Sequence, residues 1–366
     1  MALQAGIVGL PNVGKSTLFN ALSNAKAQAA NFPFCTIEPN IGVITVPDDR
    51  LIELEKLVNP QKVVPTTVEI VDIAGLVKGA SKGEGLGNQF LGNIRSTDAI
   101  IHVLRCFDDD NVIHVDGNVN PVRDKEVIDT ELQLKDLDSV DKKIPKLEKL
   151  LKQADRDVLN GYDILKKLKA HLEQGNNARS FVVSPEDRAK HIDDMFLLTM
   201  KPVLYVCNVD EKSVVNGNEH TRALIDSVKG ENAEILLVSA AIESEIAVME
   251  NYDDRQMFLE DLGLHESGVV RLIRSTYHLL NLITYFTAGV QEVRAWTIHR
   301  GMLAPQAAGV IHTDFEKGFI RVEVIKYKDF IHYGSEAACR EVGKLAVQGK
   351  DYVVEDGDIM HFRFAV

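Results

Sequence analysis

The sequence lacks the features that mark secreted and membrane proteins. Its four cysteines are far apart and form no CxxC pair: Cys35, Cys106, Cys207 and Cys339. This spacing argues against a disulfide or zinc framework and fits a reducing compartment. No apolar run approaches the ~18 residues that span a bilayer. The first residues, MALQAGIVGLPNVGKST, contain neither a basic segment nor a long apolar one. We therefore expect no signal peptide, no membrane partner and a cytoplasmic location.

Positive charge is also scarce. The chain of 366 residues has 41 Lys and Arg against 54 Asp and Glu, a net charge of −13. A negative surface repels nucleic-acid phosphates, so nonspecific binding over the whole surface is disfavoured. Residues 142–169 are the exception, with nine basic and four acidic side chains. They form either the solvated face of a coiled coil or a local contact for nucleic acid.

Five short apolar runs predict buried strands: residues 2–8, 67–71, 99–105, 203–207 and 235–239. Strands of a parallel sheet are covered on both faces and therefore show nearly continuous apolar residues. Helical patterns lie between these runs. The sequence therefore predicts an α/β fold with a mostly parallel, doubly wound sheet, formed by residues 1–124 and 199–278.

The interval 125–198 predicts a helical insertion into that domain. Apolar side chains recur there at spacings of three and four, which makes one apolar seam: Leu137, Val140, Ile144, Leu147 and Leu151. Pro145 lies inside the seam, so we expect a kink or a break in the helix. A second helix follows the Asn-Gly-Tyr at 160–162, with apolar positions Tyr162, Leu165, Leu168 and Leu172. Together they predict a coiled-coil hairpin.

Residues 279–366 predict a small α+β domain. The segments 319–325 and 352–364 have the composition of strands, and 334–350 has that of a helix.

The segment GLPNVGKST at residues 9–17 carries the strongest signal in the chain. It matches G-x-x-x-x-G-K-[ST], with a predicted strand before it and a predicted helix after it. Gly9 and Gly14 permit turns that direct backbone N–H groups inward, and the helix N-terminus adds partial positive charge. Lys15 is expected to bind the β- and γ-phosphates of a nucleotide, and the Ser16 hydroxyl to bind Mg²⁺.

Two further segments support a phosphate site. VEIVDIAG at 68–75 is a strand that ends in Asp-x-x-Gly. We expect Asp72 to hold Mg²⁺ through water and the Gly75 N–H to approach the γ-phosphate. Thr36 lies between this segment and the phosphate loop, where a switch threonine closes over the metal.

The segment CNVDE at 207–211 occupies the position of a base-recognition loop. A guanine-binding loop normally reads Asn-Lys-x-Asp. Here Val209 replaces the lysine and Glu211 replaces the aspartate, while Ser239 begins the supporting Ser-Ala turn. The carboxylate that pairs with guanine is displaced by about one methylene, so discrimination against adenine should fall. We expect ATP to bind at least as well as GTP; the alternative is a divergent site that still prefers GTP.

The glycine-rich segment DIAGLVKGASKGEGLGNQF at 72–90 resembles the second switch of the Obg family of P-loop GTPases. The altered base loop, the helical insertion and the tail at 279–321 resemble the YchF subfamily over nearly the whole chain. This resemblance implies a P-loop nucleotide-binding domain and a C-terminal TGS domain, a ubiquitin-like β-grasp module.

The resemblance also implies residue roles. The nucleotide contacts would be Asn12, Val13, Gly14, Lys15, Ser16 and Thr17, with Asn208, Val209 and Glu211 at the base. Ser16 and Thr36 would bind the metal. Leu76 stands where many switch GTPases have the glutamine that orients the attacking water. His114, in NVIHVDG, is the candidate substitute, although a loop histidine is more often structural.

These observations predict a monomeric switch protein that binds ATP with Mg²⁺, hydrolyses it slowly and associates with the ribosome, as the large subunit or whole, or with structured RNA. One alternative is a translation-associated GTPase. Another is a ribosome- or RNA-binding scaffold with incidental hydrolysis. A small-molecule kinase is disfavoured because the sequence shows no acceptor-binding lid.

Overall fold

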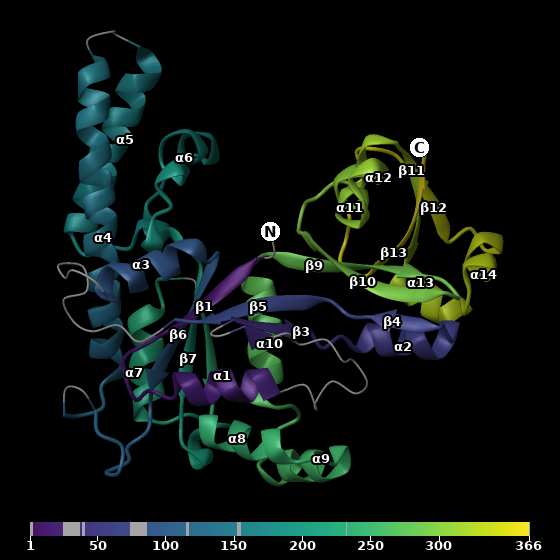
Figure 1. The fold of residues 1–366 in the computed structure, drawn as a ribbon, viewed down its shortest axis with the longest axis horizontal. Helices are drawn as coiled ribbons and strands as arrows, with labels where there is room; N and C mark the ends of the chain where they lie inside the picture. The colour runs from purple at the N-terminus through teal and green to yellow at the C-terminus, as the bar shows by residue number, and fades with distance from the viewer. Residues whose placement is uncertain are drawn as a thin grey trace. The chain divides into compact units, whose positions relative to one another are not determined.

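The structure is a computed structural model that describes residues 3–24, 37–38, 41–73, 86–114, 117–151, 155–231 and 233–365 (Figure 1). The chain divides into two compact units. The first lies within Met1–Asn24, Ile37–Gly42 and Glu69–Leu272, and the described residues of the second lie in Val43–Val68 and Ile273–Val366. The domain boundaries at 125, 199 and 279 stay predictions.

A seven-stranded sheet is formed by the described strands in the order β2-β3-β5-β1-β6-β7-β8. The strands are β1 (Gln4–Val8), β2 (Ile37–Glu38), β3 (Ile41–Thr45), β5 (Thr67–Asp72), β6 (Ala99–Arg105), β7 (Val203–Asn208) and β8 (Glu234–Val238). From β5 to β8 the neighbouring strands are parallel. All five predicted strands are therefore confirmed, and β6 is buried along its whole length. Because parallel strands end at one edge, Val8, Asp72 and Asn208 are brought to the same side of the sheet.

Helices flank these strands, and several begin at side chains that accept backbone N–H groups. They are α1 (Lys15–Asn24), α3 (Leu86–Ser96), α7 (Glu219–Val228), α8 (Ala240–Val248), α9 (Tyr252–Asp261) and α10 (Gly268–Leu279). Asn218 forms a capping box with Thr221 at the start of α7. The buried carboxylate of Glu243 accepts from the N–H groups of Gly268 and Val269, which satisfies the start of α10. None of the described helices combines the length and apolar character needed to cross a lipid bilayer.

The predicted helical hairpin is confirmed by α4 (Pro121–Leu150) and α5 (Arg156–Glu173), which lie side by side in Figure 1. Their seam is apolar and includes Val140, Ile144, Leu165 and Leu168. Short helices complete the insertion: η3 (Ala178–Ser180), α6 (Pro185–His191), η4 (Asp193–Met195) and η5 (Leu198–Met200).

The expected break at Pro145 is wrong, because α4 continues through it. Pro145 is exposed, so the Asp141 carbonyl that loses its helical donor faces the solvated side of the hairpin. Seam packing against α5 stabilises the helix on both sides of the proline.

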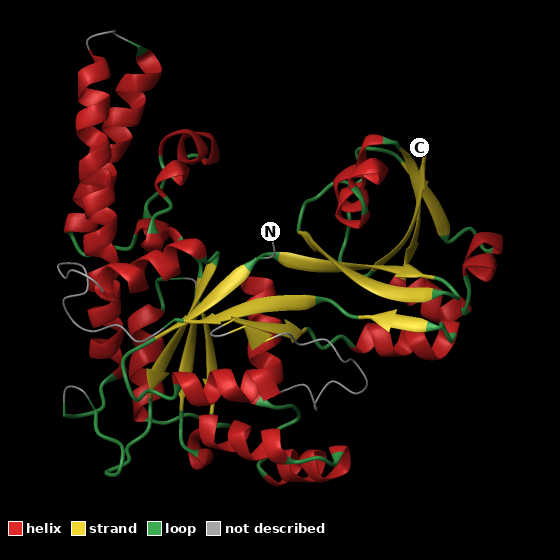
Figure 2. Cartoon of the chain, viewed as in Figure 1, coloured by secondary structure: helices red, strands yellow, loops and turns green. Residues whose placement is uncertain are grey.

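The second unit contains a six-stranded sheet in the order β12-β11-β13-β9-β10-β4, whose strands appear in yellow in Figure 2. The strands are β4 (Lys62–Val64), β9 (Leu282–Ala288), β10 (Glu292–His299), β11 (Phe319–Lys326), β12 (Leu345–Gln348) and β13 (Asp358–Phe364). The helices are α2 (Asp49–Val58), α11 (Ala304–Ile311), α12 (Thr313–Lys317), α13 (Tyr327–Tyr333) and α14 (Glu336–Glu341). A parallel central pair, β13 and β9, is flanked by antiparallel neighbours, which is the arrangement of a β-grasp.

Two apolar cores stabilise this sheet. One contains Tyr285, Ala308 and Phe362; the other joins Leu51 and Leu54 of α2 to a set from the C-terminal segment that includes Phe286. Residues 49–64 thus supply a helix and an edge strand to the second unit, which the sequence did not indicate.

The predicted helix at 334–350 is wrong over most of its length. Helix α14 ends at Glu341, and Leu345–Gln348 form strand β12. Gly343 has φ +72°, a left-handed conformation that ends the helix and turns the chain back toward β11. The predicted strand at 352–364 forms only from Asp358 onward.

Candidate nucleotide-binding site

The predicted phosphate loop joins the end of β1 to the start of α1. Gly14 has φ +96°, and a Cβ there would lie 2.3 Å from Asn208 Nδ2. A Cβ on Gly9 would lie 2.4 Å from the Val103 carbonyl oxygen. Both positions therefore require glycine, because neighbouring loops approach the backbone too closely for a side chain.

Lys15 is the first residue of α1 and is buried. Its ammonium group donates to the Leu10 carbonyl at 2.6 Å, inside the loop. Burial lowers the Lys15 pKa to about 8, although the charge of Asp72 opposes this change. A polyphosphate at the helix N-terminus would stabilise the charged ammonium. Ser16 and Thr17 are exposed on the first turn, where their hydroxyls are accessible.

Asp72 ends β5 opposite Ile7 of β1. Its Oδ1 is buried and has no hydrogen-bond partner among the residues that the structure describes. Burial raises the Asp72 pKa, and the Lys15 charge acts in the opposite direction. A buried carboxylate oxygen without a donor fits a hard divalent cation, so the residues present suit Mg²⁺. Thr36, Gly75 and Leu76 lie outside the described residues.

Asn208 connects the base loop to the phosphate loop. Its Nδ2 donates to the Val13 carbonyl at 2.9 Å, and its Oδ1 accepts from the Ala240 N–H at 3.0 Å. Both ends of one buried amide thus hold the phosphate loop and the Ser-Ala turn. Asn208 braces the site, a role that the sequence analysis had attributed to the missing lysine.

The other base-loop residues differ in exposure. Val209 is 2% exposed, and its N–H donates to the Val238 carbonyl at 2.9 Å. Glu211 is exposed at the start of η6 (Glu211–Ser213), so its carboxylate is accessible. Ser239 is fully buried, and its hydroxyl has no hydrogen-bond partner within the described part of the chain.

His114 lies in the loop after β6 and is buried. Its Nε2 is 2.8 Å from Asp124 Oδ2, at the start of α4. Asn12, predicted to contact nucleotide, donates from Nδ2 to the Ile113 carbonyl at 3.2 Å and so links the phosphate loop to the His114 loop. The sequence analysis missed Asp124 and also Arg105, whose guanidinium holds this loop. A charged residue ending the otherwise apolar run AIIHVLR was the available signal.

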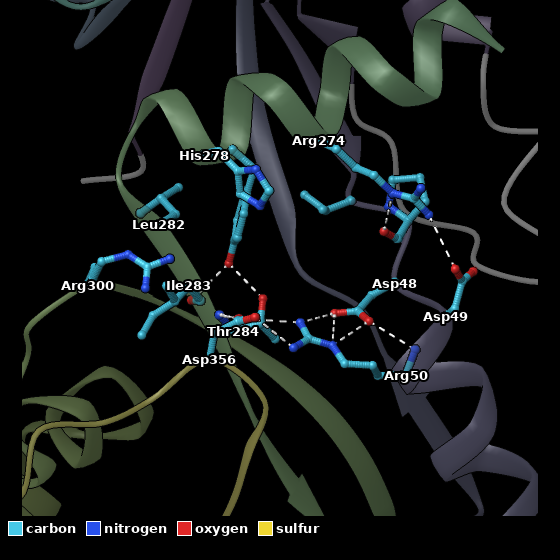
Figure 3. Close-up of a pocket in the computed structure, with 13 residues that line it drawn as sticks. Asp48, Asp49, Arg50, Arg274, His278, Leu282, Ile283, Thr284, Arg300 and Asp356 are labelled. Carbon is cyan, nitrogen blue, oxygen red and sulfur yellow. Dashed lines mark hydrogen bonds and ion pairs between the residues drawn. The ribbon is translucent and has the colours of Figure 1, made fainter. Parts of the chain in front are cut away.

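A separate cavity of about 280 Å³ lies within the second unit (Figure 3). Arg50 is placed between Asp48 and Asp356, at 2.7 and 2.8 Å. Burial alone would lower the Arg50 pKa, but the two carboxylates outweigh it and the pKa rises. Asp356 also accepts from the Thr284 N–H. No predicted site residue lines this cavity, and its central charges are paired, so we interpret it as a structural joint within that unit.

Comparisons with known proteins agree with this geometry. A family model described as "50S ribosome-binding GTPase" matches residues 4–209. Another, named YchF-GTPase_C and described as a protein of unknown function, matches residues 282–365. The curated "Ribosome-binding ATPase YchF" of Bacillus subtilis (strain 168) is 56% identical over 368 residues and covers 100% of both chains. That of Escherichia coli O157:H7 is 54% identical over 366 residues, again with 100% of both chains covered.

A solved structure of the Schizosaccharomyces pombe YchF GTPase has a TM-score of 0.89 and 39% identity, and covers 99% of this chain and 97% of that chain. The predicted fold class is thereby confirmed. The match extends over both units and over the full length of the curated relatives. The chain therefore belongs to the YchF family, as the resemblance of its switch segment and base loop predicted.

Proposed function

We propose that the protein is a switch that binds ATP with Mg²⁺, hydrolyses it slowly and associates with the ribosome. The observation that carries the proposal is the phosphate loop itself, with buried Lys15 facing Asp72 and Gly14 closed against Asn208. The name shared by the curated relatives, ribosome-binding ATPase, supports both the nucleotide and the partner. Ribosomes work in the cytoplasm, so the proposal also supports the predicted location.

The residues divide the work at the phosphates. Lys15 would bind the β- and γ-phosphates, and backbone N–H groups from Asn12 to Thr17 would bind the remaining oxygens. Ser16 and Asp72 would hold Mg²⁺, with Asp72 acting through water and Thr36 and Gly75 completing the site. Bound Mg²⁺ would neutralise charge that develops on the phosphate oxygens. Slow turnover follows from Leu76, which cannot orient water.

Base preference follows from the loop at 207–211. Asn208 is committed to the phosphate loop and the Ser-Ala turn, and Val209 is buried, so no cation stacks on the base. The exposed Glu211 is the remaining carboxylate, and Ser239 lies in the supporting turn. The site thus lacks the paired guanine contact, which favours ATP; a GTP-preferring enzyme is the alternative.

The helical hairpin is the proposed contact for ribosomal RNA. Several of its lysines already have carboxylate partners: Lys142 with Asp138, Lys143 with Asp194, Lys167 with Asp163 and Lys169 with Asp141. Lys146 and Lys149 are exposed and form no ion pair with any residue that the structure describes. These two lysines are available to RNA phosphates.

Two measurements test the proposal. Released phosphate should appear from ATP in a Mg²⁺-dependent manner, and the ribosome should bind the ATP and ADP forms with different affinity. Equal affinity of both forms would favour the scaffold alternative. Transfer of phosphate to a small acceptor, with none released, would establish a kinase.

A further inference from the structure

The His114 side chain is paired with a carboxylate that no sequence motif identified. His114 Nε2 lies 2.8 Å from Asp124 Oδ2, and the two side chains are 4% and 0% exposed. Asp124 is in the first turn of α4, four residues after the N-cap Asn120. The pair therefore joins the loop after β6 to the base of the helical insertion, within the first unit.

The carboxylate is itself held in position. Asp124 Oδ1 accepts from Arg123 Nη2 at 3.0 Å and Nε at 3.3 Å. Arg123 also donates to the Asn118 side chain and carbonyl, each at 2.7 Å. Both carboxylate oxygens thus have fixed donors, so Oδ2 presents a defined direction to the imidazole.

The backbone around His114 is fixed from the other side. Arg105 is 1% exposed, and its guanidinium donates to the carbonyls of Phe107, Asp109 and Val112. Asn12 of the phosphate loop donates to the Ile113 carbonyl. The loop is therefore anchored to β6 and to the phosphate loop on either side of the histidine.

An ionised carboxylate can only accept a hydrogen bond, so the nitrogen beside it must carry the proton. In the neutral imidazole this places the hydrogen on Nε2 and the lone pair on Nδ1. We propose that Asp124 is a positioning residue for the hydrolytic reaction: its contact with Nε2 sets the orientation of His114 and makes Nδ1 the acceptor for the attacking water. The proposal depends on the proposed ATPase function and on His114 as the water-orienting group.

In the reaction, the water oxygen forms a bond to the γ-phosphorus while the bond to the β–γ bridging oxygen breaks. A water hydrogen donates to Nδ1 during the attack, and that proton finally resides on the released inorganic phosphate. ADP leaves with the bridging oxygen. Asp124 stays ionised throughout and never contacts the nucleotide.

A purely structural role for Asp124 is the competing explanation, because removing a buried carboxylate destabilises α4 in any case. The distinguishing experiment compares Asp124→Asn, His114→Ala and the double variant for ATP turnover and ATP affinity, below the unfolding temperature of each. Asp129→Asn is the matched control, since it also removes a buried carboxylate of α4, one that pairs with Lys125 at 2.7 Å.

We expect His114→Ala and Asp124→Asn each to lower kcat at least tenfold, within the ~10²–10⁴ range of such groups. The Kd for ATP should stay within about twofold of wild type, because neither side chain binds phosphate. The double variant should be no slower than His114→Ala, since Asp124 acts only through the imidazole. The control should retain wild-type kcat.

The imidazole ¹⁵N spectrum supplies a readout that a structural role would not change. The His114 signal, identified by its loss in His114→Ala, should show the Nε2–H tautomer in wild type and a mixture in Asp124→Asn. An Nδ1–H tautomer in wild type would overturn the proposal. So would a further loss of kcat when Asp124→Asn is added to His114→Ala.

The outcomes separate this proposal from the function on which it depends. Absence of any ATP hydrolysis by wild type would refute the proposed function. Normal turnover by His114→Ala would remove His114, and Asp124 with it, from the reaction. Slow turnover by His114→Ala together with wild-type turnover by Asp124→Asn would overturn the role of Asp124 alone.

Discussion

Asn208 donates to the Val13 carbonyl at 2.9 Å and thereby joins the base loop to the phosphate loop. The same amide accepts from the Ala240 N–H, so three loops at one edge of the sheet share a single buried side chain. A change in any of these loops therefore affects the other two.

Replacing Asn208 with Ala should weaken both stability and nucleotide binding. The change leaves a buried carbonyl and a buried N–H without partners, a loss of roughly 1–3 kcal/mol for each group left unsatisfied. We expect a lower midpoint of chemical denaturation and an ATP Kd raised about tenfold. Lys212→Ala, at an exposed neighbouring position, is the control and should change neither. An unaltered ATP Kd in Asn208→Ala would show that the amide does not brace the phosphate loop.

Base preference should respond to Glu211. Shortening it by one methylene in Glu211→Asp restores the carboxylate of a guanine-binding loop, and the ratio of ATP to GTP dissociation constants should shift toward GTP. Adding Val209→Lys should extend the shift, but Val209 is buried, so a lysine there must reorient toward solvent and lower the unfolding temperature. Wild-type protein that binds GTP much more tightly than ATP would contradict the ATP assignment.

Nucleotide binding should take up protons at alkaline pH. The Lys15 pKa is lowered to about 8 from 10.5, so near and above pH 8 a large fraction of the lysine is neutral before phosphates arrive. Phosphate charge favours the ammonium form, so a proton is taken up on binding, most strongly between about pH 8 and 10. Calorimetry in buffers of different ionisation enthalpy measures this uptake.

The same lowered pKa fixes a sign for stability. Between pH 8 and 10.5 the unfolded chain holds the Lys15 proton more tightly than the folded one, so this group's destabilising effect is full below pH 8 and declines as pH rises. Lys15→Arg, which does not titrate in this range, is the control and should abolish the proton uptake. Uptake of the same size in that variant would assign the proton to another group.

The hairpin should contribute salt-dependent affinity through Lys146 and Lys149. Reversing both to Glu should weaken ribosome binding and flatten the slope of log K against log salt by about 0.7 to 0.9 for each lost phosphate contact. Lys142 and Lys167, already paired within the helix, form the matched control and should have a smaller effect when reversed. Equal slopes for all variants would make the hairpin a solvated structural arm.

The sequence could predict those parts of the structure that depend on local pattern. The strands from Gln4 to Val8 and from Ala99 to Arg105 are continuous apolar runs, and the phosphate loop is a contiguous motif whose glycines are explained by close backbone approach. The contact between His114 and Asp124 could not be predicted, because it depends on how a loop folds back onto the base of a helix. Membership of α2 and β4 in the second sheet is likewise set by packing against Phe286 and by pairing with β10, and no local signal announces either.

The most direct test of the central claim is the rate of phosphate release from ATP, with and without Mg²⁺, by wild type and by Lys15→Ala and Ser16→Ala. Lys15 supplies the charge that binds the phosphates, and Ser16 the hydroxyl that holds the metal. The account predicts slow, Mg²⁺-dependent release by wild type and nearly none by either variant, with circular dichroism unchanged. Phosphate release at the wild-type rate by either variant would contradict it.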